Sequence, residues 1–232
     1  MRLRFGCWNR NGDRVETMRQ DAKELAPGQR SAMDSPSSLE TRRRIVETAE
    51  RLFRQYGYQK TTVADIANEL SMSPANVYRF FVSKSAINEE VARLLTRDIE
   101  ASARAAATAP GLSARQRLER VIREIHRATV QRCMEDKRMH AMVHAAIEEN
   151  WDVVRAHKEV LHDILTSLVA EGVSRGEFSI DEDPAVAAKC VQMANIATCH
   201  PLIIEHCMRA NEDLEEMIEP MVAFCCRALG AR

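Results

Sequence analysis

Aromatic residues are scarce in this chain of 232 residues, where Phe, Trp and Tyr make up only 5% of the sequence. Glycine and proline are also few, with 8 and 7 residues, which argues against a turn-rich sandwich or barrel. No apolar run approaches the roughly 20 residues that span a bilayer, so we expect no membrane contact. Ala, Leu, Glu, Arg and Met are abundant instead, and this composition favours an all-α fold.

The seven cysteines show no C-x-x-C spacing, and most lie within apolar helical stretches. We therefore expect them to be small buried side chains in a reducing cytoplasm. The first residues, MRLRFGCWNRNGD, are basic but lack the apolar core and the cleavage site of a secretory signal. Both observations predict a cytoplasmic protein.

The net charge of −1 hides an uneven distribution along the chain. Residues 41–97 contain ten Lys or Arg and six Asp or Glu, whereas residues 98–232 contain sixteen and twenty-two. A basic excess confined to one modest segment is expected if that segment alone meets a polyanion.

Hydrophobic periodicity divides the chain into three parts. Residues 1–38 lack a sustained period and end in the linker-like PGQRSAMDSPSS, so we expect a flexible extension followed by domains at 39–99 and 100–232. We find no strand alternation and no internal repeat. The pattern predicts helices at about 40–56, 62–70, 74–81, 84–107, 113–133, 136–149, 151–173, 184–208 and 212–229.

Several helix ends carry clear local signals. Gly57 follows the first helix where a left-handed residue would end it, and Thr62 with Asp65 forms an N-terminal capping pattern. Asp183-Pro184 is typical of a helix start.

The stretch SMSPANVYRFFVSK at 71–84 predicts a very short helix. Ser73 can cap it and Pro74 suits its first turn, so we expect it to run from 74 to about 81. Steps of about 100° per residue place Val77, Phe80 and Phe81 on the side that faces the core. The outward side then carries a small residue, an arginine, an amide and a phenol: Ala75, Arg79, Asn76 and Tyr78.

Such a face suits the major groove of DNA, which admits one helix. Arg79 could pair with guanine and Asn76 with adenine, while Tyr78 and Lys84 could reach phosphates. A solvated face of an ordinary bundle is the alternative. Arg43 is ambiguous in the same way, because it could contact a phosphate or pair with Glu47 one turn later.

The run from TRRRIVETAERLF to VYRFFVSKSAINEEV, at about 40–95, resembles the DNA-binding region of the TetR family of bacterial transcriptional regulators. The resemblance implies a helix-turn-helix at about 62–81, with Thr62 on a phosphate and Ser73 as the cap. It implies base-facing positions at Ala75, Asn76 and Arg79, and phosphate contacts at Tyr78 and Lys84. One departure is Phe80, where the family often has histidine, and we expect altered packing rather than lost binding.

The resemblance also implies an effector pocket within helices 113–175 and a homodimer formed by the last two helices. For the effector we suggest residues with apolar or hydrogen-bonding surface on separate helices: Met134, His144, Trp151 and Met193. For the dimer we expect a stripe in the final helix and small residues in the one before: Leu214, Met217, Met221, Cys225, Ala187 and Ala194.

Two other functions compete with this interpretation. His140 and His144 have a spacing that can bind metal, as in a helical-bundle metalloenzyme, but HAMVH lacks the glutamate of H-E-x-x-H. A non-specific architectural DNA-binding protein is the second alternative. The sequence favours a homodimeric repressor that binds an inverted-repeat operator in double-stranded DNA and leaves it when a small-molecule effector binds. We expect no catalytic residue, metal or cofactor.

Overall fold

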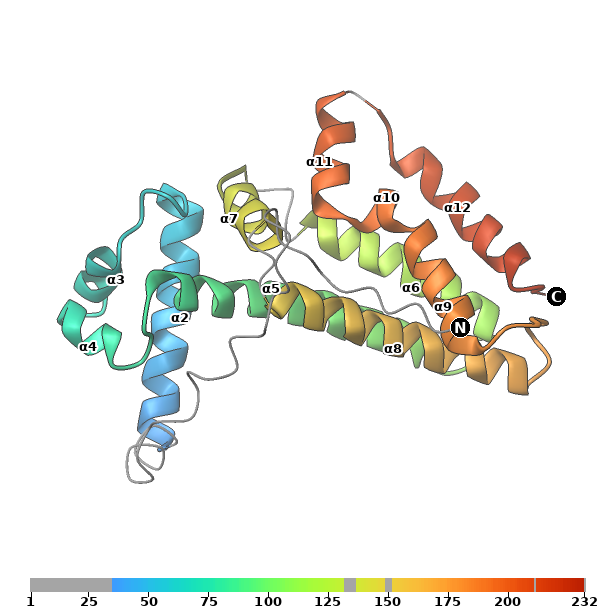
Figure 1. Ribbon diagram of the computed structural model, residues 1–232, viewed down its shortest axis with the longest axis horizontal. Helices are drawn as coiled ribbons and strands as arrows, with labels where there is room; N and C mark the ends of the chain where they lie inside the picture. The colour runs from blue at the N-terminus through green and yellow to red at the C-terminus, as the bar shows by residue number, and fades with distance from the viewer. Residues whose placement is uncertain (1–34, 132–136, 149–151, 211, 232) are drawn as a thin grey trace, which may run out of the picture. The chain divides into compact units, whose positions relative to one another are not determined.

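The computed structural model of the chain describes residues 35–131, 137–148, 152–210 and 212–231. All regular elements in these ranges are helices, which confirms the predicted all-α fold (Figure 1). The helices are α2 (Pro36–Tyr56), α3 (Val63–Glu69), α4 (Pro74–Tyr78), α5 (Lys84–Ala107), α6 (Ala114–Thr129), α7 (Lys137–Glu148), α8 (Asp152–Ser174), α9 (Pro184–Ala194), α10 (Ile196–Cys199), α11 (Pro201–Arg209) and α12 (Glu215–Ala228).

The chain divides into two units, Met1–Arg42 and Arg43–Arg232. Of the first unit, the described residues comprise only the opening turns of α2 and Ser35 before them. The expected flexible segment 1–38 lies mostly outside the described residues. None of the helices described is both long enough and apolar enough to cross a membrane.

A shared core holds α3 and α4 against the helices on either side of them in sequence. Each of the four helices contributes a side chain with no exposed surface: Phe53 from α2, Ile66 from α3, Val77 from α4 and Val91 from α5. Burial of one such side chain contributes roughly 1.5–3 kcal/mol, so this small core is sufficient to fix the short helix α4.

The predicted local signals are present. Gly57 adopts a φ of 91°, in the left-handed region that favours glycine, and its N–H donates to the Phe53 carbonyl. Thr62 and Asp65 form a complete capping box at the start of α3. The Asp183 side chain accepts from the Ala185 N–H ahead of Pro184, the first residue of α9.

In the C-terminal part, α5, α6 and α8 pack against one another, α9 lies along α8, and α12 packs on α6 and α9 (Figure 1). Buried polar side chains tie these helices together. Arg117 of α6 donates to the Ala107 carbonyl and to both carboxylate oxygens of Glu171 in α8. These bonds join the end of α5 to both neighbouring helices.

Two predicted helix ends, at the start of α2 and at the end of the exposed helix α4, differ from the structure. The first helix begins at Pro36 rather than near Glu40, because the Ser35 hydroxyl accepts from the Ser38 N–H and caps it. The short helix α4 ends at Tyr78 rather than 81, and the N–H groups of Arg79 and Phe80 bond three residues back in a tighter turn.

The expected helix 184–208 is three helices, α9, α10 and α11. Pro201 has no N–H to continue a helix and disfavours helical backbone at the residue before it. His200 accordingly adopts φ −92° and ψ 121°. By contrast, α5 spans 84–107 as predicted, so the expected domain boundary at 99/100 falls inside a continuous helix.

Candidate nucleic-acid interface

Helix α4 begins with the predicted cap. The Ser73 hydroxyl accepts from the Asn76 N–H at 3.2 Å, and Pro74 occupies the first helical position. At about 1.5 Å per residue, its 5 residues extend about 8 Å, less than the sequence predicts. Arg79 directly follows the helix and retains helical backbone angles.

The two sides of α4 differ as the sequence predicts. Val77 and Phe81 are buried, and Phe80 is partly buried against the same core. Ala75 and Arg79 are exposed, Tyr78 is 50% exposed and Asn76 is partly exposed. The outward side therefore offers a guanidinium, a phenol and an amide around a methyl group, which is a set suited to base edges and phosphates.

The start of α3 presents Thr62 at the surface. Its hydroxyl donates to the Asp65 carboxylate at 2.7 Å and accepts from the Asp65 N–H at 3.1 Å. The bonds that the Thr62 hydroxyl and the Thr62 backbone N–H donate to the Asp65 carboxylate hold the pKa of this carboxyl below its ordinary value. The hydroxyl is therefore already engaged in the free chain, and a phosphate contact would require it to exchange partners.

Arg43 lies on the exposed side of α2, where its guanidinium pairs with Glu47 at 2.5 Å. This is the alternative pairing that the sequence offered for Arg43. Both side chains are at least half exposed, so the pair contributes little to stability and could open toward a phosphate.

Lys84 is bound to the loop between α2 and α3. Its ammonium donates to the Tyr58 carbonyl at 2.5 Å and lies 4.5 Å from the centre of the Tyr58 ring. Partial burial lowers the pKa of this ammonium below its ordinary value. The contact joins the first turn of α5 to the loop before α3. No local pattern predicts it beyond the aromatic residue after Gly57.

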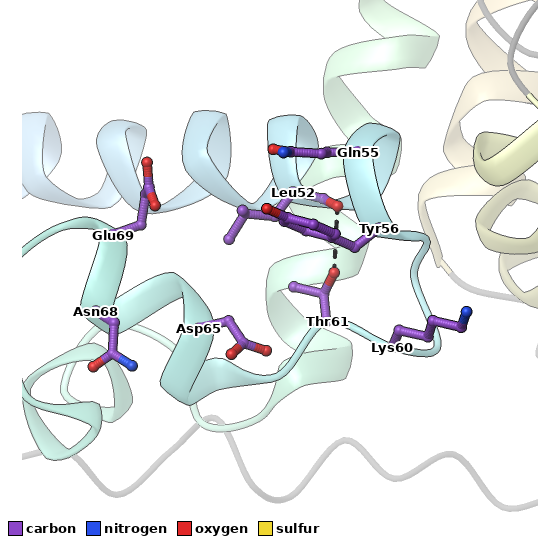
Figure 2. Close-up of a pocket in the computed structure, with 8 residues that line it drawn as sticks. All are labelled: Leu52, Gln55, Tyr56, Lys60, Thr61, Asp65, Asn68 and Glu69. Carbon is purple, nitrogen blue, oxygen red and sulfur yellow. Dashed lines mark hydrogen bonds between the residues drawn. The ribbon is translucent and has the colours of Figure 1, made fainter.

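A groove of about 590 Å³ runs between α2 and α3 (Figure 2). Figure 2 shows side chains of α2 along one side and those of α3 along the other, with Thr61 donating to the Leu52 carbonyl. The two carboxylates that line it are engaged, Asp65 by Thr62 and Glu69 by Arg51 at 2.7 Å.

The suggested effector residues do not define a site in the described part of the chain. Met134 and Trp151 lie outside the described residues. His144 is exposed, and Met193 is 54% exposed on α9. Their role stays a prediction.

The suggested dimer residues differ in exposure. Ala187 and Cys225 are only 1% exposed within the single chain, and their place at an interface stays a prediction. Ala194, Leu214 and Met221 are partly buried against the core. Val186 and Phe224, which no sequence pattern singled out, are about half exposed on α9 and α12. Together with Met193 and Met217 they form what we call the α9–α12 apolar face.

Three of the five described cysteines, Cys207, Cys225 and Cys226, are buried as predicted, but Cys190 is exposed. Burial raises the pKa of Cys199 and of Cys226 to about 11. Both thiols are therefore protonated at neutral pH and are weak nucleophiles. Across 35–131, 137–148, 152–210 and 212–231, no three His, Cys, Asp or Glu side chains are grouped so that they could hold a metal ion.

Two parts of the sequence match known protein families. Residues 45–91 match "Bacterial regulatory proteins, tetR family", and residues 114–218 match "Tetracyclin repressor-like, C-terminal domain". The chain belongs to the TetR family. The first match contains α3 and α4 with their exposed side chains, so the chain is a helix-turn-helix transcriptional regulator.

Individual relatives are distant. An uncharacterised HTH-type transcriptional regulator of Bacillus subtilis, YhgD, is 23% identical over 145 residues, 60% of this chain and 72% of that protein. A TetR/AcrR-family regulator from Thermobifida fusca is 23% identical with a TM-score of 0.59, over 80% of this chain and 96% of the other. SmeT, the repressor of the Stenotrophomonas maltophilia multidrug efflux pump SmeDEF, is 16% identical with a TM-score of 0.60, over 81% and 89%. At these identities the two structures show the fold alone.

Proposed function

We propose that the TetR-family chain is a homodimeric, sequence-specific repressor that acts on DNA in the cytoplasm and is released by a small-molecule effector. The observation that carries the proposal is the exposed side of α4, where Arg79, Tyr78 and Ala75 project from a helix fixed by a buried Val77. In this proposal Arg79 and Asn76 read bases, while Tyr78, Lys84 and Thr62 position the helix on phosphates.

One copy of α4 is too short to discriminate an operator. A helix about 8 Å long contacts only a few base pairs, and specific sites require several matched positions on each half of a repeat. We therefore propose that two copies read an inverted repeat, with the two α4 helices in successive major grooves. SmeT, which has the same fold, is a repressor, and this supports the direction of control proposed here.

The α9–α12 apolar face is the surface that we propose for the dimer. Its four side chains lie on two helices that pack together, so they can form one continuous patch. Exposed apolar surface of this kind is typical of protein–protein contacts rather than of monomer surfaces.

We expect Arg79→Ala to weaken binding to the preferred operator by about 1–3 kcal/mol, because a bidentate contact to one base pair is lost. The preferred operator can be obtained by selecting random duplexes with the wild-type protein. The measurement is fluorescence anisotropy on that operator and on single-base variants, with preference relaxed at one base step in each half-site.

Arg104→Ala is the matched control for Arg79→Ala. It removes the same charge from an exposed position in α5 outside the tetR-family match, and we expect operator affinity to change less than about twofold. An equal loss on all DNA sequences with Arg79→Ala would instead assign Arg79 to a phosphate.

The effector proposal predicts reciprocal coupling. A ligand that weakens operator binding roughly 5- to 150-fold must itself bind more weakly, by the same factor, when operator is present. Compounds that raise the melting temperature can be titrated by calorimetry into the protein with and without operator. Equal ligand affinities in the two titrations would show that the compound is not an effector.

A further inference from the structure

Asn88 is buried without any hydrogen bond. It lies in the second turn of α5, its relative exposure is 0%, and neither its amide nitrogen nor its amide oxygen has a partner. A primary amide offers two donor hydrogens and an acceptor oxygen, and buried polar side chains are nearly always paired. An unpaired amide therefore raises the free energy of the arrangement in which it is found.

Among the described residues that are buried as a whole, two others carry a polar atom without a partner, and both are partly satisfied. Asn195 lacks a partner only at its oxygen, since its nitrogen donates to the Val191 carbonyl and to the Cys225 sulfur. Arg117 lacks one only at Nε, because both its terminal nitrogens are bonded. Asn88 differs from both because its whole polar group is unpaired.

Asn88 lies at a point in α5 where the free-energy cost of its unpaired amide can affect the position of the DNA-reading helices. One turn before it, Lys84 is bound to Tyr58 in the loop that leads to α3. One and two turns after it, Ala92 and Leu95 are buried on the same side of α5, which packs against α6, α7 and α8. Asn88 therefore lies between the turn of α5 that holds the DNA-reading helices and the part that packs on the C-terminal helices.

We propose that Asn88 is a positioning residue that keeps two arrangements of the first turns of α5 close in free energy. In the arrangement described here the amide is unpaired, and in the other a small displacement of α5 gives it a partner. Because Lys84 moves with these turns, the two arrangements place α4 differently and bind operator with different affinity. This inference rests on the proposed operator binding, and an effector would act by favouring one arrangement.

The test is Asn88→Leu, which keeps the number of side-chain heavy atoms and removes the polar group. Leucine removes the free-energy cost of the unpaired amide in the arrangement described here. In the other arrangement it cannot make the hydrogen bond that the amide would make, so that arrangement is no longer favoured. We expect the melting temperature to rise by about 3–8 °C. We also expect affinity for the selected operator to change at least about fivefold, and hydrogen exchange to slow at the first turns of α5. The sign of the affinity change identifies the arrangement that binds DNA.

Asn195→Leu is the matched control, because it removes a buried asparagine that does make hydrogen bonds. Its melting temperature should fall, and its operator affinity should change less than about twofold. Should Asn88→Leu fold poorly by circular dichroism, Asn88→Met provides a flexible apolar side chain with the same expected effects.

Two results would overturn the inference. A melting temperature that stays the same or falls in the Asn88 variant would show that the amide is satisfied in solution. A higher melting temperature with unchanged operator affinity, or a rise of equal size in Asn195→Leu, would show that the amide has no part in positioning. Failure of the wild-type protein to select any DNA sequence would instead refute the proposed function and is recognised before any variant is made.

Discussion

Phe224→Glu is expected to convert the dimer to a monomer and to reduce operator affinity by at least about 100-fold. Phe224 is 55% exposed on α12, so glutamate is tolerated in the isolated chain. In the proposed dimer the same position would bury two carboxylates opposite apolar side chains, and unpaired buried charges are strongly disfavoured. Without the dimer, the second half-site no longer binds at high effective concentration. Sedimentation equilibrium and operator titration measure the two effects.

Ala170→Glu provides the control for Phe224→Glu, since it adds the same charge at an exposed position of α8. It should leave both the association state and the operator affinity unchanged. A Phe224→Glu protein that remains dimeric with full operator affinity would place the dimer interface elsewhere than the α9–α12 apolar face.

Phe178→Ala is expected to lower the free energy of unfolding by about 3–5 kcal/mol, because a buried aromatic side chain is replaced by a cavity. Phe178 is 3% exposed and lies beside α8, where the backbone of Gly172 approaches its ring. Urea denaturation followed by circular dichroism measures the change. Val82→Ala, at a position 88% exposed, should change stability by less than about 0.5 kcal/mol.

Gly172 gives this prediction a second and sharper test. A Cβ at Gly172 would lie 2.3 Å from Cδ2 of Phe178, so Gly172→Ala should destabilise the wild-type chain. In the Phe178→Ala background the ring is absent, and the better helix propensity of alanine should make the same change stabilising by up to about 1 kcal/mol. The same sign in both backgrounds would show that the ring does not occupy this position.

The parts of the fold that follow from neighbouring residues could be predicted from the sequence. Ser73 with Pro74, and Thr62 with Asp65, start their helices through bonds that span only three residues. The division of α4 into a buried and an exposed side also follows from helical geometry, because Val77 and Arg79 are separated by about 200°. These local rules are sufficient to locate the exposed face of α4 without any tertiary contact.

The remaining features depend on contacts between segments distant in sequence, which periodicity does not encode. The Lys84 ammonium donates to the Tyr58 carbonyl, 26 residues earlier in the chain. This contact leaves the lysine side chain partly buried rather than fully exposed. Ala187 and Cys225 fit an interface stripe by spacing, yet other helices of the same chain cover them. Helical spacing identifies an apolar side chain but not the partner that buries it.

The backbone of α5 is helical from Lys84 to Ala107, so the tetR-family match ends within a continuous helix rather than at a loop. Each residue added to an α-helix turns everything beyond it by about 100°. A single insertion near the middle of α5 would therefore swing the DNA-reading helices about a third of a turn around its axis. Recombination between relatives can therefore exchange the DNA-reading helices only if α5 keeps the same number of residues. This limits which effector domains can be joined to a given set of DNA-reading helices.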